Sequence, residues 1–306
     1  MEASVPIVFD PRAVRLHRAR AAGRKPAVDF LTVEAAERLA ERLEVVTRQF
    51  PMALDLGCFT GALARALALA PGLRGGIGRL VSSDTALACA RRAERDAVVA
   101  DFETLPFKDG AFDLVLSNLA LHWTNDLPGA LVQIRRILQP DGLLLATLWG
   151  GETLWELRRA LMEAELEEEG GASPRVSPFA DIRDLGALLQ RAGFSLPVVD
   201  GDLIEVTYAD PLALMRELRF MGESNAVAER RKGFSRRATL FRAAEHYRDK
   251  FARADGRIPA TFQLVTLTAW APHESQPKPL RPGSAAQRLA DALGTKERPA
   301  GDKATP

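Results

Sequence analysis

The residues with the clearest chemical meaning form an apolar run that leads into a glycine turn. Asp55 lies near the end of this run, and Gly57 and Gly61 follow it. A helical pattern comes next, at Leu63, Ala64, Leu67 and Ala68. A strand, a tight turn and a helix start in series present backbone N–H groups, so this segment predicts a pocket where a ligand reaches the main chain. The spacing is not G-x-G-x-x-G, and no Lys-Ser/Thr pair follows to make a phosphate loop.

Polar side chains end the next three predicted strands. Asp84 can accept hydrogen bonds from both hydroxyls of a ribose, although capping the next helix is the plainer alternative. Asp101 can accept from an adenine amino group while Phe102 offers the ring a flat apolar face; the alternative is a loop carboxylate beside a core phenylalanine. Asn118 lies opposite the glycine turn, at the carboxyl edge where open α/β sheets bind ligands.

His122 and Trp123 follow the fourth predicted strand and are the candidate catalytic residues. They fit a general base beside a cation–π surface for a guanidinium, or equally a packed tryptophan with a satisfied histidine. An iron site of the 2-oxoglutarate type needs an acid two residues after a histidine, and none of the four histidines has one. The two cysteines, Cys58 and Cys89, cannot build a zinc site unaided, so we predict no metal site.

Strands and helices alternate through the first half of the chain, and nearly continuous apolar strands favour a parallel sheet covered on both faces. Two helices are expected first, at 10–24 and at 32–49, with Thr32 as the N-cap of the second. The expected strands are 52–56, 78–83, 97–100, 112–117, 142–149, 197–207 and 261–270. The expected later helices are 60–69, 84–95, 126–138, 153–169, 181–193, 210–221 and 235–253.

The order of these parts resembles the class I S-adenosylmethionine-dependent methyltransferases. The resemblance implies a doubly wound, mostly parallel, seven-stranded Rossmann-like α/β sheet with an antiparallel edge strand and added helices. It also implies S-adenosyl-L-methionine as the cofactor, held by the residues Asp55, Gly57, Gly61, Asp84, Asp101, Phe102 and Asn118. One departure stands out, because the family's central glycine of the turn is Phe59 here. A phenylalanine must turn away or fill space meant for the methionine part of the cofactor.

Tracts outside the cofactor motifs sharpen the resemblance to the respiratory complex I assembly factor 5 (arginine hydroxylase) group. They include Phe9-Asp10, Arg18 to Ala22, Leu119 to Trp123, Ser177-Pro178-Phe179 and Met221 to Asn225. The likeness runs from about residue 9 to residue 285. It implies a protein substrate, namely a quinone-site subunit of respiratory complex I. Arg18, Arg20, His122-Trp123 and the segment 221–225 are then expected to form one protein-binding cleft above the cofactor.

The overall charge and apolar runs exclude two kinds of partner. The 306 residues carry a net charge of +1, so no field attracts nucleic acid, and no apolar run suits a transmembrane segment. The N-terminal arginines raise the question of a mitochondrial presequence, but Glu2 and Asp10 argue against one. We therefore expect a cytoplasmic protein.

We expect three parts: N-terminal helices over 1–50, a methyltransferase-fold domain over 51–276 with a helical insertion at about 208–255, and a disordered tail over 277–306. Three functions stay open at this point. They are methyl transfer to a protein, hydroxylation of a protein arginine in complex I assembly, and a non-catalytic assembly chaperone, which Phe59 favours.

Overall fold

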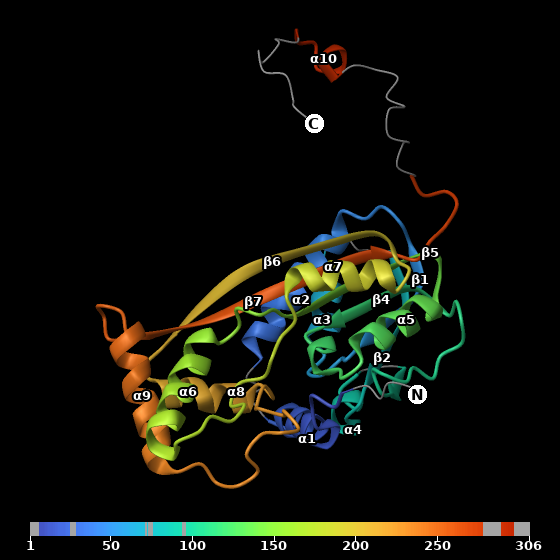
Figure 1. The fold of residues 1–306 in the computed structure, drawn as a ribbon. Helices are drawn as coiled ribbons and strands as arrows, with labels where there is room; N and C mark the ends of the chain where they lie inside the picture. The colour runs from blue at the N-terminus through green and yellow to red at the C-terminus, as the bar shows by residue number, and fades with distance from the viewer. Residues whose placement is uncertain are drawn as a thin grey trace. The chain divides into compact units, whose positions relative to one another are not determined.

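One mixed sheet of seven strands organises the computed structural model, in the order β3-β2-β1-β4-β5-β7-β6 (Figure 1). The strands are β1 (Phe50–Leu56), β2 (Ile77–Asp84), β3 (Ala97–Val99), β4 (Phe112–Asn118), β5 (Leu138–Trp149), β6 (Ser195–Tyr208) and β7 (Ile258–Trp270). The first five strands pair in parallel, whereas β7 runs antiparallel to both β5 and β6. The predicted mostly parallel, seven-stranded sheet with an antiparallel edge is confirmed.

The structure describes residues 6–24, 29–70, 72, 76–93, 96–277 and 289–296. They belong to two units, residues 1–272 and residues 273–306. The second unit contains the short helix α10 (Leu289–Ala292). Most of the tail predicted to be disordered lies outside the described residues.

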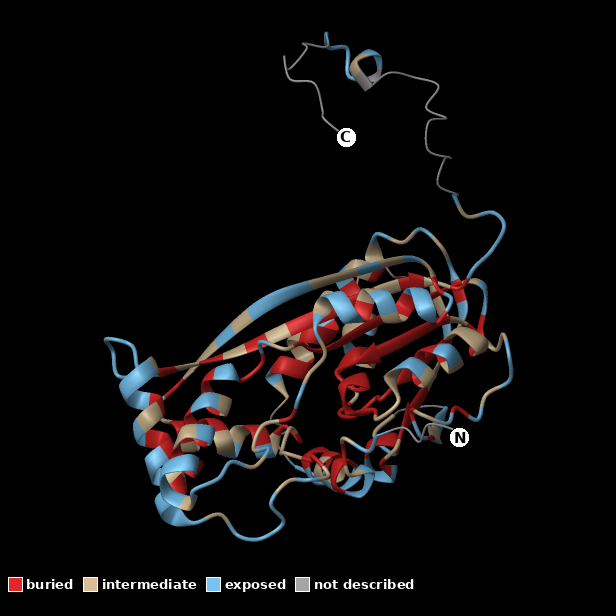
Figure 2. Ribbon diagram, in the orientation of Figure 1, coloured by how far each residue is buried: buried red, intermediate tan, exposed pale blue. Residues whose placement is uncertain are grey.

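Helices cover both faces of the sheet. On one face lie α2 (Phe30–Glu44) and α3 (Ala62–Leu69), whose leucines and alanines pack against Ala53, Leu114 and Leu143. On the other face lie α5 (Leu127–Ile137) and α7 (Ile182–Arg191), packed against Leu54 and Val115. Neighbouring residues of β1 and β4 thus enter opposite cores, as the period of two in a strand requires. Figure 2 shows these inner strands buried and much of β6 exposed.

The long strands β6 and β7 extend past the rest of the sheet and carry a second core. There α6 (Trp155–Glu169), α8 (Pro211–Phe220) and α9 (Arg237–Phe251) pack around Tyr208, Tyr247 and Phe262 (Figure 1). The helices α8 and α9 lie between β6 and β7 in the chain. The remaining helices of this unit include α1 (Pro11–Ala22), the single turn α4 (Leu87–Ala90) and the 3₁₀ helix η2 (Leu121–Trp123). No helix within the described ranges is both long and apolar enough to cross a membrane.

Two sequence-based details are wrong. Thr32 is not an N-cap: α2 begins at Phe30, after Asp29, and Thr32 is buried inside the helix. The helix expected over 84–95 is only the turn α4, because the Asp84 carboxylate accepts from the backbone N–H of Ala86 and holds the preceding residues in a bend.

Candidate functional site

The glycine turn joins β1 to α3 as predicted, and only glycine fits its first position. Gly57 has φ +92°, and a Cβ there would lie 2.2 Å from the Cβ of Ala120. The backbone N–H groups of the turn are already used within the protein. Gly57 and Cys58 both donate to the Ser83 carbonyl, at 2.8 and 2.9 Å, and Gly61 donates to Cys58 at 2.7 Å. The turn is therefore internally hydrogen-bonded and presents fewer free donors than its sequence suggests.

Asp84 lies at the end of β2 and forms a buried ion pair with Arg18 of α1. Arg18 Nη2 donates to Asp84 Oδ2 at 2.7 Å and to the Gly57 carbonyl at 3.2 Å. The backbone N–H of Phe59 donates to the same carboxylate at 3.2 Å. Burial acts to lower the pKa of Arg18, but the charge and the hydrogen bond of Asp84, with smaller contributions from Cys89 and Glu223, together outweigh burial and raise that pKa above its ordinary value. The carboxylate predicted to bind a ribose is thus occupied by a side chain of this protein, and its ribose role stays a prediction.

Phe59 is buried beside this ion pair. Its backbone adopts φ +45°, in the left-handed region that a non-glycine residue rarely occupies. The Arg18 guanidinium carbon lies 4.7 Å from the ring centroid, within the range of a cation–π contact. The far end of the ring faces Gly222, where an added Cβ would lie 3.4 Å from Phe59 Cζ. Phe59 therefore fills the space between the glycine turn, α1 and the segment that follows α8.

Asp55 is a buried carboxyl group that lacks a hydrogen bond. It is fully buried, and among the described residues neither of its carboxylate oxygens has a hydrogen-bond partner. Burial, and to a smaller extent the negative charge of Asp84, raise the pKa of Asp55 to about 7, while the positive charge of Arg18 opposes the shift. An unpartnered buried carboxyl group is costly to keep, and this one lies directly before the glycine turn.

Asp101 and Phe102 lie after β3, and the structure separates their environments. Asp101 is exposed and accepts from the backbone N–H of Glu103 at 2.9 Å, whereas Phe102 is buried. Both line a small cavity of about 40 Å³ that also touches Pro11, Val14 and Trp123. The carboxylate and the aromatic ring that the sequence assigned to an adenine thus share one surface depression.

The Asn118 side chain makes hydrogen bonds within the protein that connect three elements of the fold. Its amide nitrogen donates to the Thr32 carbonyl at 2.9 Å, and its amide oxygen accepts from Thr147 Oγ1 at 2.9 Å. These bonds tie β4 to α2 and β5. A role of Asn118 in cofactor binding stays a prediction that nothing in its contacts supports.

His122 and Trp123 are both buried, on the 3₁₀ helix η2. Trp123 packs edge-to-face on Phe9, with ring centroids 5.3 Å apart, and its indole N–H has no partner. His122 Nε2 lies 3.4 Å from Glu223 Oε2, and its ring is surrounded by Trp123, Trp149 and Phe179. Glu223 is the functional candidate that sequence reasoning missed as an individual residue, although the tract 221–225 had been placed in the cleft.

A cavity of about 390 Å³ brings together several of the predicted cleft segments. Its wall includes Trp123, His17 of α1, and Glu223 from the segment 221–225. The apolar part comes from Trp149 and Phe262 together with leucines of α6 and α8. Arg18 does not line this cavity, because its side chain turns inward to Asp84, and His122 lies behind the wall.

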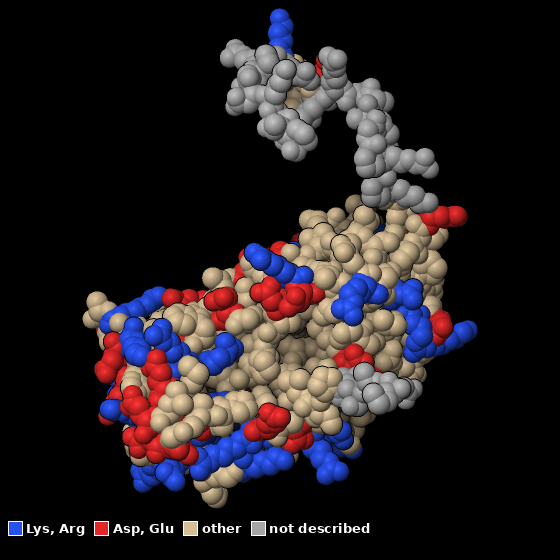
Figure 3. Space-filling model, viewed as in Figure 1, with Lys and Arg blue, Asp and Glu red and all other residues tan. Residues whose placement is uncertain are grey.

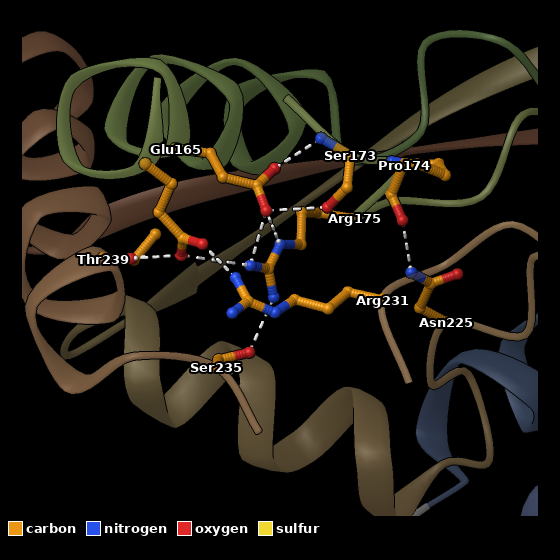
Figure 4. Close-up of polar contacts among 9 residues, drawn as sticks. Glu165, Ser173, Pro174, Arg175, Asn225, Arg231, Ser235 and Thr239 are labelled. Atoms are coloured by element: carbon orange, nitrogen blue, oxygen red, sulfur yellow. Dashed lines mark hydrogen bonds and ion pairs between the residues drawn. The ribbon is translucent and has the colours of Figure 1, made fainter. Parts of the chain in front are cut away.

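A network of charged groups builds the far wall of the cavity (Figure 4). Arg175 donates through Nη2 to Glu165 Oε1 at 2.6 Å and through Nη1 to Ser235 Oγ at 2.6 Å. Ser173 binds the same buried carboxylate through its backbone and its hydroxyl. Burial acts to raise the pKa of Glu165, but the bonds from Arg175 and Ser173 lower it below its ordinary value.

This network extends to neighbouring acidic residues of α6. Glu169 pairs with Arg231 and accepts from Thr239, and Asn225 donates to the Pro174 carbonyl at 2.7 Å. Figure 3 shows acidic and basic side chains intermingled over α6 and α9. The acidic residues at the end of α6 therefore do more than face solvent, because Glu165 and Glu169 bind side chains of the loops that enclose the cavity. In the part of the chain that the structure describes, no group of three or more acidic, histidine or cysteine side chains could hold a metal ion.

The comparisons with known proteins agree with this architecture. Residues 54–146 match the family model of a methyltransferase domain. A candidate methyltransferase from Bacillus halodurans has the same fold, with a TM-score of 0.52 and 15% identity over 78% of this chain and 99% of that chain. The sheet order and the glycine turn thus define a protein of the class I methyltransferase fold.

Similarity over the whole length defines the family more narrowly. The chain is 44% identical over 268 residues to the mitochondrial arginine-hydroxylase NDUFAF5 of Danio rerio, covering 86% of this chain and 82% of that protein. It is 39% identical over 270 residues to a malonyl-acyl-carrier-protein O-methyltransferase of Halorhodospira halophila, covering 86% and 88%. The chain belongs to the NDUFAF5 family, so the predicted resemblance is confirmed.

Proposed function

We propose that this protein binds S-adenosyl-L-methionine at the carboxyl edge of β1, β2 and β3. Asp84 would hold the ribose, while Asp101 and Phe102 would hold the adenine. The unpartnered carboxyl group of Asp55 supports a polar ligand at this edge, because binding would relieve a buried group that has no partner. When bound, the cofactor supplies an activated methyl group on a positively charged sulfonium.

Binding in this way requires Arg18 to leave Asp84. The pair is almost fully buried, so the ribose hydroxyls must replace a charge-assisted hydrogen bond rather than a water contact. Phe59 occupies adjacent space and must move as well. The apparent cofactor affinity then equals the intrinsic affinity multiplied by the fraction of molecules in which Arg18 of α1 has left Asp84.

We further propose that the substrate is an arginine of a protein, specifically of a quinone-site subunit of respiratory complex I. The observation that carries this proposal is the lining of the cavity of about 390 Å³. It offers the aromatic faces of Trp123 and Trp149 together with the carboxylate of Glu223. Aromatic faces and a carboxylate are the groups that recognise a guanidinium. The name of the Danio rerio relative, arginine-hydroxylase, supports the same substrate class.

The reaction best supported is hydroxylation of that arginine. Its balance requires dioxygen and a two-electron reductant: one oxygen atom enters a C–H bond of the side chain, and the other leaves as water with two protons. Trp123 and Trp149 would orient the guanidinium, and the His122–Glu223 pair could hold a proton at the edge of the cavity. The structure supplies neither co-reactant, and we assign no residue to either.

Methyl transfer to the same side chain is the second candidate. The malonyl-acyl-carrier-protein O-methyltransferase relative and the methyltransferase-domain match favour it. The protein would then position the nucleophile and exclude water, and the methyl group would leave the sulfonium by in-line displacement.

Mass spectrometry of complex I subunits from cells with and without this protein tests the proposal. A protein-dependent gain of one oxygen on an arginine supports hydroxylation, and a gain of one methylene supports methyl transfer. No change in any subunit refutes both and leaves an assembly chaperone. We also keep a cytoplasmic location as a proposal, because both cysteines are free; the Danio rerio relative is named mitochondrial, and cell fractionation decides between the two.

A further inference from the structure

A second cavity, between α1 and α8, has four basic side chains and no acidic one among the described residues that line it. It has a volume of about 570 Å³, and its lining consists of His17, Arg20, Arg24, Arg219, Phe220 and Ser224. Basic side chains gather along the lower edge of the first unit in the view of Figure 3, where α1 lies in Figure 1. We call this cavity the arginine pocket.

Its basic residues come from two elements that approach each other. His17, Arg20 and Arg24 follow one another at spacings of three and four along α1 and its end, so they share one helix face. Arg219 reaches the pocket from α8. The Arg24 guanidinium lies over the Phe220 ring, 3.7 Å from its centroid, which fixes one cation at the pocket wall.

The arginines of this pocket differ from others near it in their partners. Arg175 pairs with Glu165, Arg230 with Asp10, and Arg231 with Glu169. Within the described ranges, by contrast, the side chains of Arg20 and Arg219 make no hydrogen bond or ion pair. Like charges brought together repel one another, so an anion that binds between them is stabilised.

The positive charges near this pocket affect the pKa of His17. Burial lowers the pKa of His17, and the positive charges of Arg230 and Arg20 lower it further, whereas a hydrogen bond with the Ser224 backbone and the charge of Glu223 oppose the shift. The Nδ1 atom of His17 is buried and has no hydrogen-bond partner in the part of the chain that the structure describes. The Nδ1 atom of this imidazole and the neighbouring guanidinium groups are therefore available to form hydrogen bonds with a ligand.

We infer that the arginine pocket binds the carboxylate of an acidic residue in the protein substrate, close in sequence to the arginine that occupies the neighbouring cavity. The inference rests on the proposed function for the position of that arginine. The two cavities share His17, Arg219 and Ser224, so one peptide can enter both. Guanidinium groups bind carboxylates through two parallel hydrogen bonds, which gives the pocket a preference for Asp or Glu over neutral side chains.

Fluorescence anisotropy with labelled peptides and the full-length protein tests this inference. The probes are the peptides GGRGEE, GGRGQQ and GGAGEE. We expect GGRGEE to bind about tenfold or more tightly than GGRGQQ, as for about 1.4 kcal/mol or more of lost charge-assisted bonding. Arg20→Gln and Arg219→Gln should each reduce this difference, while Arg12→Gln, an exposed arginine of α1 that does not line the pocket, serves as the matched control and should leave it unchanged.

The outcomes separate the inference from the function on which it rests. If GGAGEE binds as tightly as GGRGEE while the preference for EE over QQ persists, the arginine pocket stands and the arginine substrate is refuted. Equal binding of the EE and QQ peptides, a preference that survives both variants, or no measurable binding of GGRGEE overturns the inference. Displacement by millimolar inorganic phosphate without any EE preference also overturns it, because the pocket is then a phosphate site.

Discussion

Removal of Arg18 should weaken the fold and strengthen cofactor binding in the same protein. The guanidinium of Arg18 and the carboxylate of Asp84 are 2% and 0% exposed, so the pair is shielded from water and salt. Removing one partner of a buried pair costs about 3–5 kcal/mol, because the other charge stays buried. In the Arg18→Ala variant, Asp84 keeps the backbone N–H groups of Phe59 and Ala86, at 3.2 and 2.9 Å, but loses its charged partner.

The expected gain in cofactor affinity has the same origin. In the parent protein the ribose must displace the Arg18–Asp84 hydrogen bond, whereas in the variant it meets a carboxylate that lacks its charged partner. A charge-assisted hydrogen bond contributes about 1.5–3 kcal/mol, so S-adenosylmethionine should bind the variant about tenfold to a hundredfold more tightly. The cofactor should also raise the melting temperature of the variant more than that of the parent.

Isothermal titration calorimetry and urea unfolding measure the two effects. Arg12→Ala, an exposed position of the same helix, is the matched control and should change neither quantity. Arg18→Gln keeps the methylenes that pack near Phe59 and provides a folded alternative if the alanine variant does not fold. Weaker cofactor binding in folded Arg18→Gln than in the parent would refute the reasoning, because Arg18 would then be a cofactor ligand and not its competitor.

Three further changes test other parts of the site. Asp55→Asn should remove a pH dependence of the folding stability. The pKa of Asp55 is raised from 3.8 to about 7 in the folded protein, so the stability that this group contributes is greatest at low pH and falls by about 2 kcal/mol between about pH 5.5 and 7. Urea unfolding at several pH values should detect this fall in the parent and not in the variant. Phe59→Gly should relieve the left-handed backbone strain but lose a buried ring, so we expect about 2–4 kcal/mol of destabilisation. The cofactor affinity should be unchanged or improved. A clear loss of affinity by calorimetry would mean that the ring packs on the ligand. Glu165→Gln should leave Arg175 without its carboxylate and destabilise the cavity wall by about 3 kcal/mol, with faster hydrogen exchange near Ser173; unchanged exchange would argue against a clamp.

The fold could be predicted because each strand and helix carries its own local signal. The strand before Gly57 and the apolar strands β4 and β5 are short, nearly continuous hydrophobic runs between turn residues, which is typical of buried parallel strands. Helix ends were less predictable because they depend on contacts from elsewhere. The turn α4 stops short of the expected helix where Arg92 contacts the Ala22 carbonyl of α1, a partner seventy residues away in the chain.

The sequence predicted which strands and segments carry the residues of the candidate site, but not which of those residues contact one another. Motif spacing placed Asp84 and Asp101 at the correct strand ends, since the carboxyl ends of parallel strands meet at one edge. It placed Arg18 and the segment 221–225 near the same edge. It could not show that Arg18 binds Asp84, because the pattern of a helix fixes which residues share a face and not which distant carboxylate they meet.

The sequence by itself determined the sheet, the glycine turn and the family, because these depend on local periodicity, turn residues and the order of short motifs. Only the tertiary structure decided the state of the site: Arg18 holds Asp84, Asp55 lies buried without a partner, and Glu223 faces His122. Those facts depend on how far each group is removed from water and which charges lie within a few ångströms. Burial and charge proximity are properties of the packed chain, and packing is what brings Arg18 of the first helix onto Asp84 beside the glycine turn.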